Sequence, residues 1–249
     1  MTYRLCKGFS IELLLFIYNI EEQRYSGDWD VETTFPQPLA MVDTALFTIL
    51  NERLCLILAR RKEPPEQGEL ALPGGFVHVQ EDVDTEDAAR RVIRAKLGFD
   101  APYLEQLYTF SGKDRDTRGW SISVAYYALI PASLLDQSQV AETLPVEDLP
   151  KLPFDHDQIV AKAIERLRSK ATYSSLPAFL LPEIFTLNDL HGIYQQTQGT
   201  RLDKASFRHK IMEQDIIEPI PGQFRTGAHR PAQLYRLTHR ALTPFERKI

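Results

Sequence analysis

The stretch LPGGFVHVQE, residues 72–81, decides the fold that the sequence predicts. Strand-favouring residues from Ala71 to Val77 are interrupted by a Pro-Gly-Gly turn, and a helical pattern follows over Thr85–Leu97. Asp84 or Thr85 caps this helix, and a glycine stands just past its end, the usual C-terminal stop. The glycine pair, the spaced helix and the terminal Gly98-Phe99 together argue against an isolated tight turn.

Patterns on either side of this stretch predict an α+β fold. Residues 40–60 are typical of a hairpin with a polar turn at Asn51-Glu52-Arg53, and Ser121–Ile130 is again strand-like. Mixed strands and helices in this order indicate an α+β domain. An amphipathic helix over His156–Lys170 follows, and we interpret it as the connection to a second domain.

After residue 174 the sequence predicts short helices in place of mixed strands and helices. Thr186 caps one helix that closes at Gly199, and Asp203 caps the next, with Phe207, Ile211 and Met212 expected on its inner side. A loop rich in Gly, Pro and Arg over 221–231 then separates two strand-like segments. Helix, short turn, helix and hairpin in this order predict a winged helix-turn-helix.

The predicted organisation therefore has three parts. Residues 1–155 form the first domain, with residues 1–38 an unassigned extension, residues 156–172 the linking helix, and residues 173–249 the winged helix-turn-helix. Two cysteines, Cys6 and Cys55, cannot build a disulfide framework, which fits a cytoplasmic protein. The apolar run at residues 11–20 is far too short to span a bilayer, so we expect no membrane segment.

The charge distribution differs between the two parts. The chain carries a net charge of −5, yet residues 171–249 hold ten Lys or Arg against seven Asp or Glu. A basic module behind an acidic one is typical of a protein whose C-terminal part touches nucleic acid. Chance variation on a short segment explains such an excess equally well, so charge alone does not decide between these interpretations.

The glycine stretch and its helix resemble the Nudix box. Gly75 and Glu81 match its first two landmarks, and counting back from Gly98 places Arg91 at its arginine, with a spacer two residues longer than the common form. The resemblance predicts a Nudix α/β/α sandwich. Its three helix glutamates, which hold Mg²⁺ against a pyrophosphate in Nudix enzymes, fall on Val92, Ala95 and Lys96.

Those replacements predict binding without hydrolysis. Positions 92, 95 and 96 share one helix face, and none of the three residues offers an oxygen ligand. We therefore expect no catalytic residue, no metal site and no required cofactor. The lysine could itself pair with a phosphate. The opposing interpretation, kept open, is an active Nudix pyrophosphatase on ADP-ribose-like substrates with an accessory C-terminal domain.

A second segment, DRDTRG at residues 114–119, resembles the Arg-Asp-Pro-Arg-Gly turn of ADP-ribose-type Nudix domains, with Thr117 replacing the proline. Arginine suits a pyrophosphate because its planar fork binds oxygens in pairs. The resemblance and the local chemistry predict these ligand-binding residues: Arg60, Arg61, Phe76, Glu81, Lys96, Arg115, Arg118 and Trp120. The alternative is that the aromatic residues are core packing and the two turn arginines are solvated.

Three C-terminal stretches resemble the Nudix-related transcriptional regulators of NAD metabolism, the NrtR family. They are TLNDLHGIY at 186–194, LDKASFRHK at 202–210 and HRPAQLYRL at 229–237. The resemblance implies a homodimeric repressor of NAD biosynthesis or salvage genes that binds a near-palindromic double-stranded DNA operator. It also implies that ADP-ribose or a related nucleotide acts as the effector and releases the protein from DNA. Ser206 departs from the asparagine expected there.

The winged module contributes the predicted DNA contacts. On the second helix of the motif they are Lys204, Ser206, Arg208 and Lys210, and in the wing Arg225, Thr226, His229 and Arg230. The same residues could form a solvated basic surface, or the module could bind a protein instead of DNA.

Overall fold

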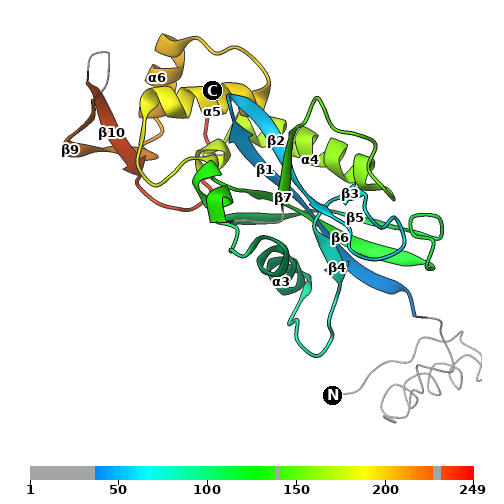
Figure 1. The fold of residues 1–249 in the computed structure, drawn as a ribbon. Coiled ribbons are helices and arrows are strands. Elements are labelled where there is room, and N and C mark those ends of the chain that lie inside the picture. The colour runs from blue at the N-terminus through cyan, green and yellow to red at the C-terminus, as the bar shows by residue number, and fades with distance from the viewer. Residues whose placement is uncertain (1–36, 138–140, 227–230) are drawn as a thin grey trace, which may run out of the picture. The chain divides into compact units, whose positions relative to one another are not determined.

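Seven strands form the main sheet in the computed structural model, which describes residues 37–137, 141–226 and 231–249 (Figure 1). Its path runs β3-β2-β1-β6-β5, with β4 paired to β1 and β7 paired to β2. The strands are β1 (Leu39–Leu50), β2 (Arg53–Arg60), β3 (Leu70–Ala71), β4 (Gly74–Phe76), β5 (Tyr103–Gly112), β6 (Ser121–Leu129) and β7 (Ala141–Pro145). β1 and β6 run parallel, and the other pairs are antiparallel.

The β1–β2 hairpin confirms the predicted turn at Asn51 and Glu52, whereas Arg53, also predicted in the turn, begins β2. Asn51 and Glu52 both have positive φ angles, 48° and 60°, as the two-residue turn that suits the strand twist requires. Apolar side chains then alternate along each strand. Leu46 of β1 belongs to the core on one face of the sheet, and the next residue, Phe47, to the core on the other.

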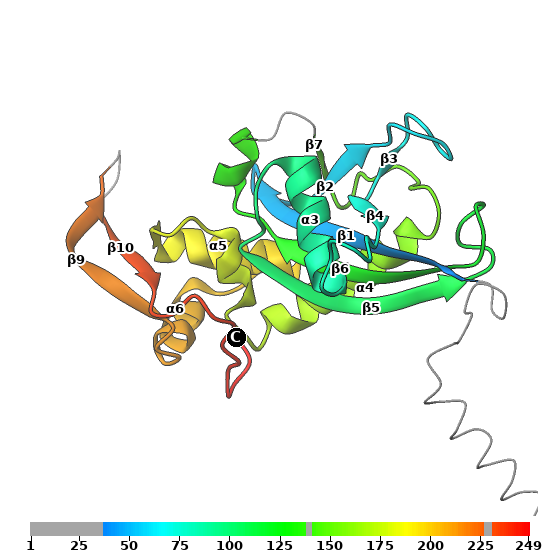
Figure 2. The same cartoon turned by 90° about the horizontal axis from the view of Figure 1, so that it is seen from below.

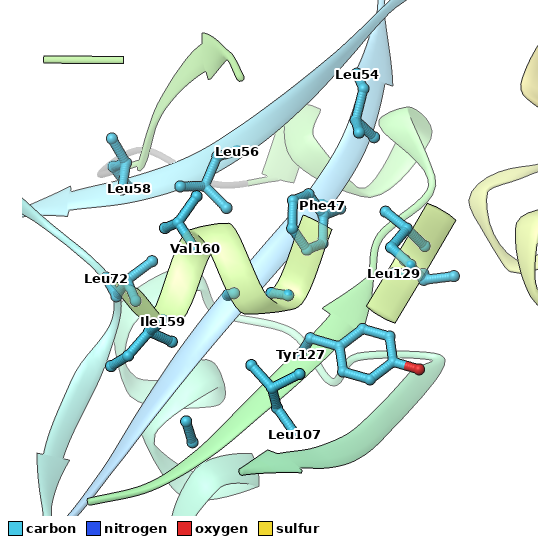
Figure 3. Close-up of a cluster of buried hydrophobic side chains, with 14 of the residues drawn as sticks. Phe47, Leu54, Leu56, Leu58, Leu72, Leu107, Tyr127, Leu129, Ile159 and Val160 are labelled. Atoms are coloured by element: carbon cyan, nitrogen blue, oxygen red, sulfur yellow. The ribbon is translucent and has the colours of Figure 1, made fainter. Parts of the chain in front are cut away.

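One helix covers each of these faces, which confirms the predicted α/β/α sandwich. α3 (Thr85–Leu97) brings Ile93 and Leu97 to the core that contains Leu46. α4 (His156–Ala171) brings Ile159 and Val160 to the opposite core (Figure 3). Figure 2 shows α3 lying across the sheet.

The ends of α3 agree with the prediction residue by residue. The Asp84 side chain accepts a hydrogen bond from the Asp87 amide at 2.9 Å, and Gly98 closes the helix at a φ of 85°. The role predicted for α4 needs correction. Its apolar side packs into the sheet's core, so it is the second helical layer of the sandwich and not merely a linking segment.

The C-terminal elements are η2 (Leu176–Leu180), β8 (Phe185–Thr186), α5 (Leu187–Gln198), α6 (Lys204–Met212), β9 (Ile217–Arg225) and β10 (Ala232–Leu237). α5 begins with a capping box between Thr186 and Asp189 and ends at Gly199. The strands pair in the order β8-β10-β9. Helix, turn, helix and hairpin therefore occur as predicted, with β8 as an added strand.

Several details differ from the sequence prediction. Met212 was expected on the inner side of α6 and is 41% exposed, because the helix ends there and only Phe207 and Ile211 reach the core. β9 extends to Arg225, into the predicted loop. Strands β5 and β7 and the turn of 3-10 helix η1 (Ala132–Gln137) were not predicted. Within the described ranges, no helix is long and apolar enough to cross a membrane.

Residues 38–249 form one compact unit. The domain boundaries predicted near residues 155 and 173 stay a prediction. η2 and the sheet share a core, in which the rings of Tyr103 and Phe179 lie 4.9 Å apart. Independent folding of the two parts stays a prediction.

Candidate functional site

A cleft of about 260 Å³ opens where the ends of β2, β3 and β4 meet the β5–β6 turn. Six cationic side chains and three carboxylates line it. Six of the eight predicted ligand residues lie there: Arg60, Arg61, Phe76, Lys96, Arg115 and Arg118. The tertiary fold thus gathers in one place side chains that are up to 58 positions apart along the chain, from Arg60 to Arg118.

Glu81 and Trp120 do not line this cleft, and their predicted ligand contacts stay a prediction. Glu81 is exposed and its carboxylate lies 3.0 Å from His78 Nδ1. The motif arginine, Arg91, pairs instead with Asp82 through two contacts of 2.7 Å, which leaves Glu81 on the outside of the loop. The hydrogen bond from Arg91 lowers the pKa of Asp82 to about 2. Trp120 is 51% exposed at the start of β6.

A buried ionic network lies beneath the cleft. Arg115 donates to both oxygens of Asp155, at 2.8 and 2.9 Å, and to Asp43 at 3.2 Å. The Leu72 amide donates to His156 Nδ1 at 3.1 Å, so the ring proton lies on Nε2, which is 3.4 Å from Asp43. Arg115, predicted as a ligand contact, is therefore held by two carboxylates in the cleft floor.

These contacts keep Asp43 and Arg115 ionised. Burial would raise the pKa of Asp43, but His156, Ser123 and Arg115 together lower it to about 2. Burial would likewise lower the pKa of Arg115, but Asp155 and Asp43 raise it. The glycine at position 74 belongs to the same arrangement, because a Cβ there would overlap the Asp43 carboxylate.

Two guanidinium groups stack on aromatic rings at the cleft. Arg118 lies 4.9 Å from the ring centre of Phe76 and also holds Asp116 at 2.6 Å. Arg61 lies 4.9 Å from the ring centre of Phe154, whose backbone has a positive φ of 57°. Such stacks hold each guanidinium group in place and leave some of its N–H groups free to donate to an anionic ligand.

Several cleft residues were missed by sequence reasoning, among them Asp43, Asp116, Phe154 and His156. Asp43 carried a signal, because it is the one charged residue in the mostly apolar strand LAMVDTALFTIL. Asp116 lies within the DRDTRG segment, in which the arginines alone suggested a ligand. Phe154 and His156 carried no signal, since they adjoin the start of a helix whose pattern indicated only a connection.

The motif positions on α3 do not suit a divalent cation. Val92 is buried beside Gly75, Ala95 is exposed, and of the three only Lys96 lines the cleft. The predicted common face is thus divided between core, solvent and cleft. Among residues 37–137, 141–226 and 231–249, no group of three or more His, Cys, Asp or Glu side chains is placed to hold a metal ion.

The second candidate surface is the outer face of α6. Lys204, Ser206, Arg208 and Lys210 are all exposed, while Phe207 packs inward against the rings of α5. The Lys210 ammonium donates to the Lys248 carbonyl at 3.2 Å. Arg208 has no hydrogen-bond or ion-pair partner among the described residues.

The turn before α6 is fixed by α5. His191 Nε2 lies 2.9 Å from the Leu202 carbonyl, and the Leu202 amide donates to Gln195 Oε1 at 2.9 Å. In the wing, Thr226 is exposed and Arg225 donates to both oxygens of Asp189, at 2.8 and 3.0 Å. The wing residues His229 and Arg230 lie outside the described residues.

Comparison with known proteins adds independent information. The model of the NUDIX domain matches residues 41–167, and that of the NrtR DNA-binding winged helix domain matches residues 177–237. A relative from Acinetobacter baylyi, described as an ADPR responsive transcriptional repressor, is 37% identical over 86% of this chain and 88% of its own length. An ADP-ribose pyrophosphatase from Methanocaldococcus jannaschii is 32% identical over 62% of this chain and 93% of its own.

Two solved structures extend the likeness. Shewanella oneidensis NrtR in complex with a 27mer DNA superimposes with a TM-score of 0.77 at 33% identity, over 84% of this chain and 99% of that one. The NUDIX domain of the same protein in complex with ADP ribose gives a TM-score of 0.52 at 34% identity, over 59% of this chain and 98% of that one.

Proposed function

Because the chain belongs to the NrtR family of Nudix-related regulators, we propose that it is a transcriptional repressor of NAD biosynthesis or salvage genes. Its winged helix-turn-helix binds operator DNA, and its Nudix domain binds ADP-ribose or a related nucleotide that releases the operator. The observation that carries this proposal is the joint match to a DNA-bound structure and to an ADP-ribose-bound domain of one relative.

The DNA contacts come from α6 and the wing. Winged-helix proteins place the second helix of the motif in the major groove, and the exposed Lys204, Ser206, Arg208 and Lys210 occupy that helix here. The wing adds Arg225, Thr226, His229 and Arg230. One module contacts too few bases to select a promoter, so the protein acts as a two-fold dimer on a near-palindromic operator.

The Nudix domain binds its effector without hydrolysing it. The positions that carry the metal-binding glutamates in Nudix enzymes hold a buried valine, an exposed alanine and a lysine. The similarity to an archaeal ADP-ribose pyrophosphatase favours the opposite function, hydrolysis. We favour binding alone, because a water activated by Mg²⁺ needs oxygen ligands that these three positions do not supply.

A continuous set of contacts joins the cleft to the DNA-binding helix. Arg115 in the cleft floor holds Asp155, the residue before α4. At the other end of α4, Gln198 of α5 donates to the Ala171 carbonyl at 3.0 Å, and α6 packs on α5 through Phe207. We propose that a ligand that shifts Arg115 moves α4, and through it α5 and α6, and so changes the spacing of the two DNA-binding helices in the dimer.

The decisive experiment is a gel shift on promoter DNA of neighbouring genes, with and without ADP-ribose. We expect a specific complex whose affinity falls about 5- to 150-fold with saturating ADP-ribose, the usual span of allosteric coupling. Operator affinity that stays the same at saturation contradicts the proposal.

Gln198→Ala tests the route of coupling. This variant should bind DNA and ADP-ribose as the wild type does but release the operator less. Gln196→Ala is the matched control, because it truncates a glutamine of the same helix whose side chain forms no hydrogen bond with another described residue. Equal release by the two variants contradicts coupling through the Gln198–Ala171 hydrogen bond.

A further inference from the structure

Six Lys and Arg side chains line the cleft, and three of them are already paired with carboxylates. Arg115 is held by Asp43 and Asp155, and Arg118 by Asp116. Arg60 pairs with Glu142, a residue of the neighbouring strand β7. These pairs position the guanidinium groups, but they also offset much of the charge that an anionic ligand would meet.

Lys96 differs from these residues. It lies in the last turn of α3, is half-buried and lines the cleft, and no described carboxylate lies within ion-pair distance of its ammonium. A lysine near a helix C-terminus is also stabilised by the helix dipole, which accounts for its presence there but not for its place in the cleft. The ammonium is a compact, mobile charge with three donors.

Position 96 is also the position at which Nudix enzymes place a metal-binding glutamate. The neighbouring motif positions cannot hold the metal: Val92 belongs to the core with Val42 and Tyr126, and Ala95 has no donor atom. A positive charge at position 96 also repels a divalent cation. The same place in the cleft thus carries a covalently attached cation, the Lys96 ammonium, where Nudix enzymes carry a ligand for a metal ion.

We infer that the Lys96 ammonium replaces the divalent cation, so that this cleft binds the pyrophosphate of its nucleotide without any metal. The inference rests on the proposed effector, ADP-ribose. A metal-free site also accounts for a sensor that retains its ligand intact, because a charge on a lysine neutralises a pyrophosphate but activates no water.

The test is calorimetric titration of the full-length protein with ADP-ribose, once in EDTA and once in excess Mg²⁺. We expect the same Kd in both. Lys96→Gln should weaken binding about 10- to 100-fold in both buffers, the value of one charge-assisted hydrogen bond, and Lys96→Arg should retain most of the affinity. Lys113→Gln is the control, because it removes one charge from an exposed residue outside the cleft.

The possible results separate this inference from the proposed function. Binding that requires Mg²⁺, or metal-free binding that Lys96→Gln leaves unchanged, overturns the inference, even where ADP-ribose still releases the operator. Metal-free binding that depends on Lys96 but leaves operator affinity unchanged supports the inference and contradicts the repressor mechanism. No heat of binding in either buffer overturns both.

Discussion

Arg208→Ala is the sharpest perturbation of the DNA-binding face. Arg208 lies on the exposed side of α6, one residue after the buried anchor Phe207, and its guanidinium has no partner among the described residues. An arginine that forks onto a base or phosphate contributes about 1–3 kcal/mol. The substitution should therefore lower operator affinity about 5- to 150-fold for each half-site. In a two-fold dimer both half-sites are weakened, and the two free-energy changes add when the sites are independent.

Fluorescence anisotropy with labelled operator, repeated over a salt series, measures this change in affinity. If Arg208 binds a phosphate, the slope of log affinity against log salt falls by about one for each phosphate that is no longer neutralised. If it binds a base edge, the slope stays the same and discrimination at one base pair disappears. Affinity for ADP-ribose in the absence of DNA should not change, because the cleft lies on other elements.

Arg90→Ala is the matched control. Arg90 is an arginine on α3 that pairs with Glu86 at 2.7 Å, four residues before it, and such surface pairs contribute about 0.3–0.5 kcal/mol. Both variants remove one positive charge, and both should unfold within about 0.5 kcal/mol of the wild type. Equal operator affinity of the two variants would refute the assignment of α6 as the DNA-binding helix.

Three further predictions concern the cleft. The purified protein with Mg²⁺ should not hydrolyse ADP-ribose at an enzyme-like rate; a turnover on the order of 1 s⁻¹ in a phosphate-release assay would restore the pyrophosphatase function. ADP-ribose at 100 times its Kd should raise the free energy of unfolding by about 2.7 kcal/mol, which thermal unfolding measures as a higher melting temperature. Arg118→Ala should reduce this rise in melting temperature. An unchanged melting curve at millimolar ADP-ribose counts against a sensor. Arg115→Ala leaves the buried Asp43 and the partly buried Asp155 without this cation and should cost about 3–5 kcal/mol in chemical denaturation. A loss below about 1 kcal/mol would show that the network is not structural.

The helices and their ends followed from the sequence because they depend on neighbours along the chain. A cap acts over three residues, and Asp84, Thr186 and Asp203 all accept the hydrogen bonds that their positions predicted. Glycines at 98 and 199 stop two helices by adopting positive φ angles. The resemblance of residues 72–99 to the Nudix box likewise lies in one continuous stretch, and it identified the sandwich and the altered helix face.

The sequence failed where the outcome depends on which distant strands become neighbours. Strands β5 and β7 were not predicted because their apolar alternation is weak, whereas pairing with β6 and β2 stabilises them. Glu81 occupies the motif position, yet Arg91 pairs with the next carboxylate, Asp82. Val92 is buried, Ala95 is exposed and Lys96 lines the cleft, and this difference depends on how α3 lies against β4.

The charged residues show most clearly what the sequence determined and what the tertiary structure decided. By itself the sequence determined that arginines gather near residues 60 and 118, and that a basic helix follows Asp203. Only the tertiary structure decided which of them pair with carboxylates: Arg115 is bound by one 40 positions away, and Arg225 by one 36 positions away. Ion pairs depend on distance in space and on burial, and the folded chain sets both by bringing remote segments into contact.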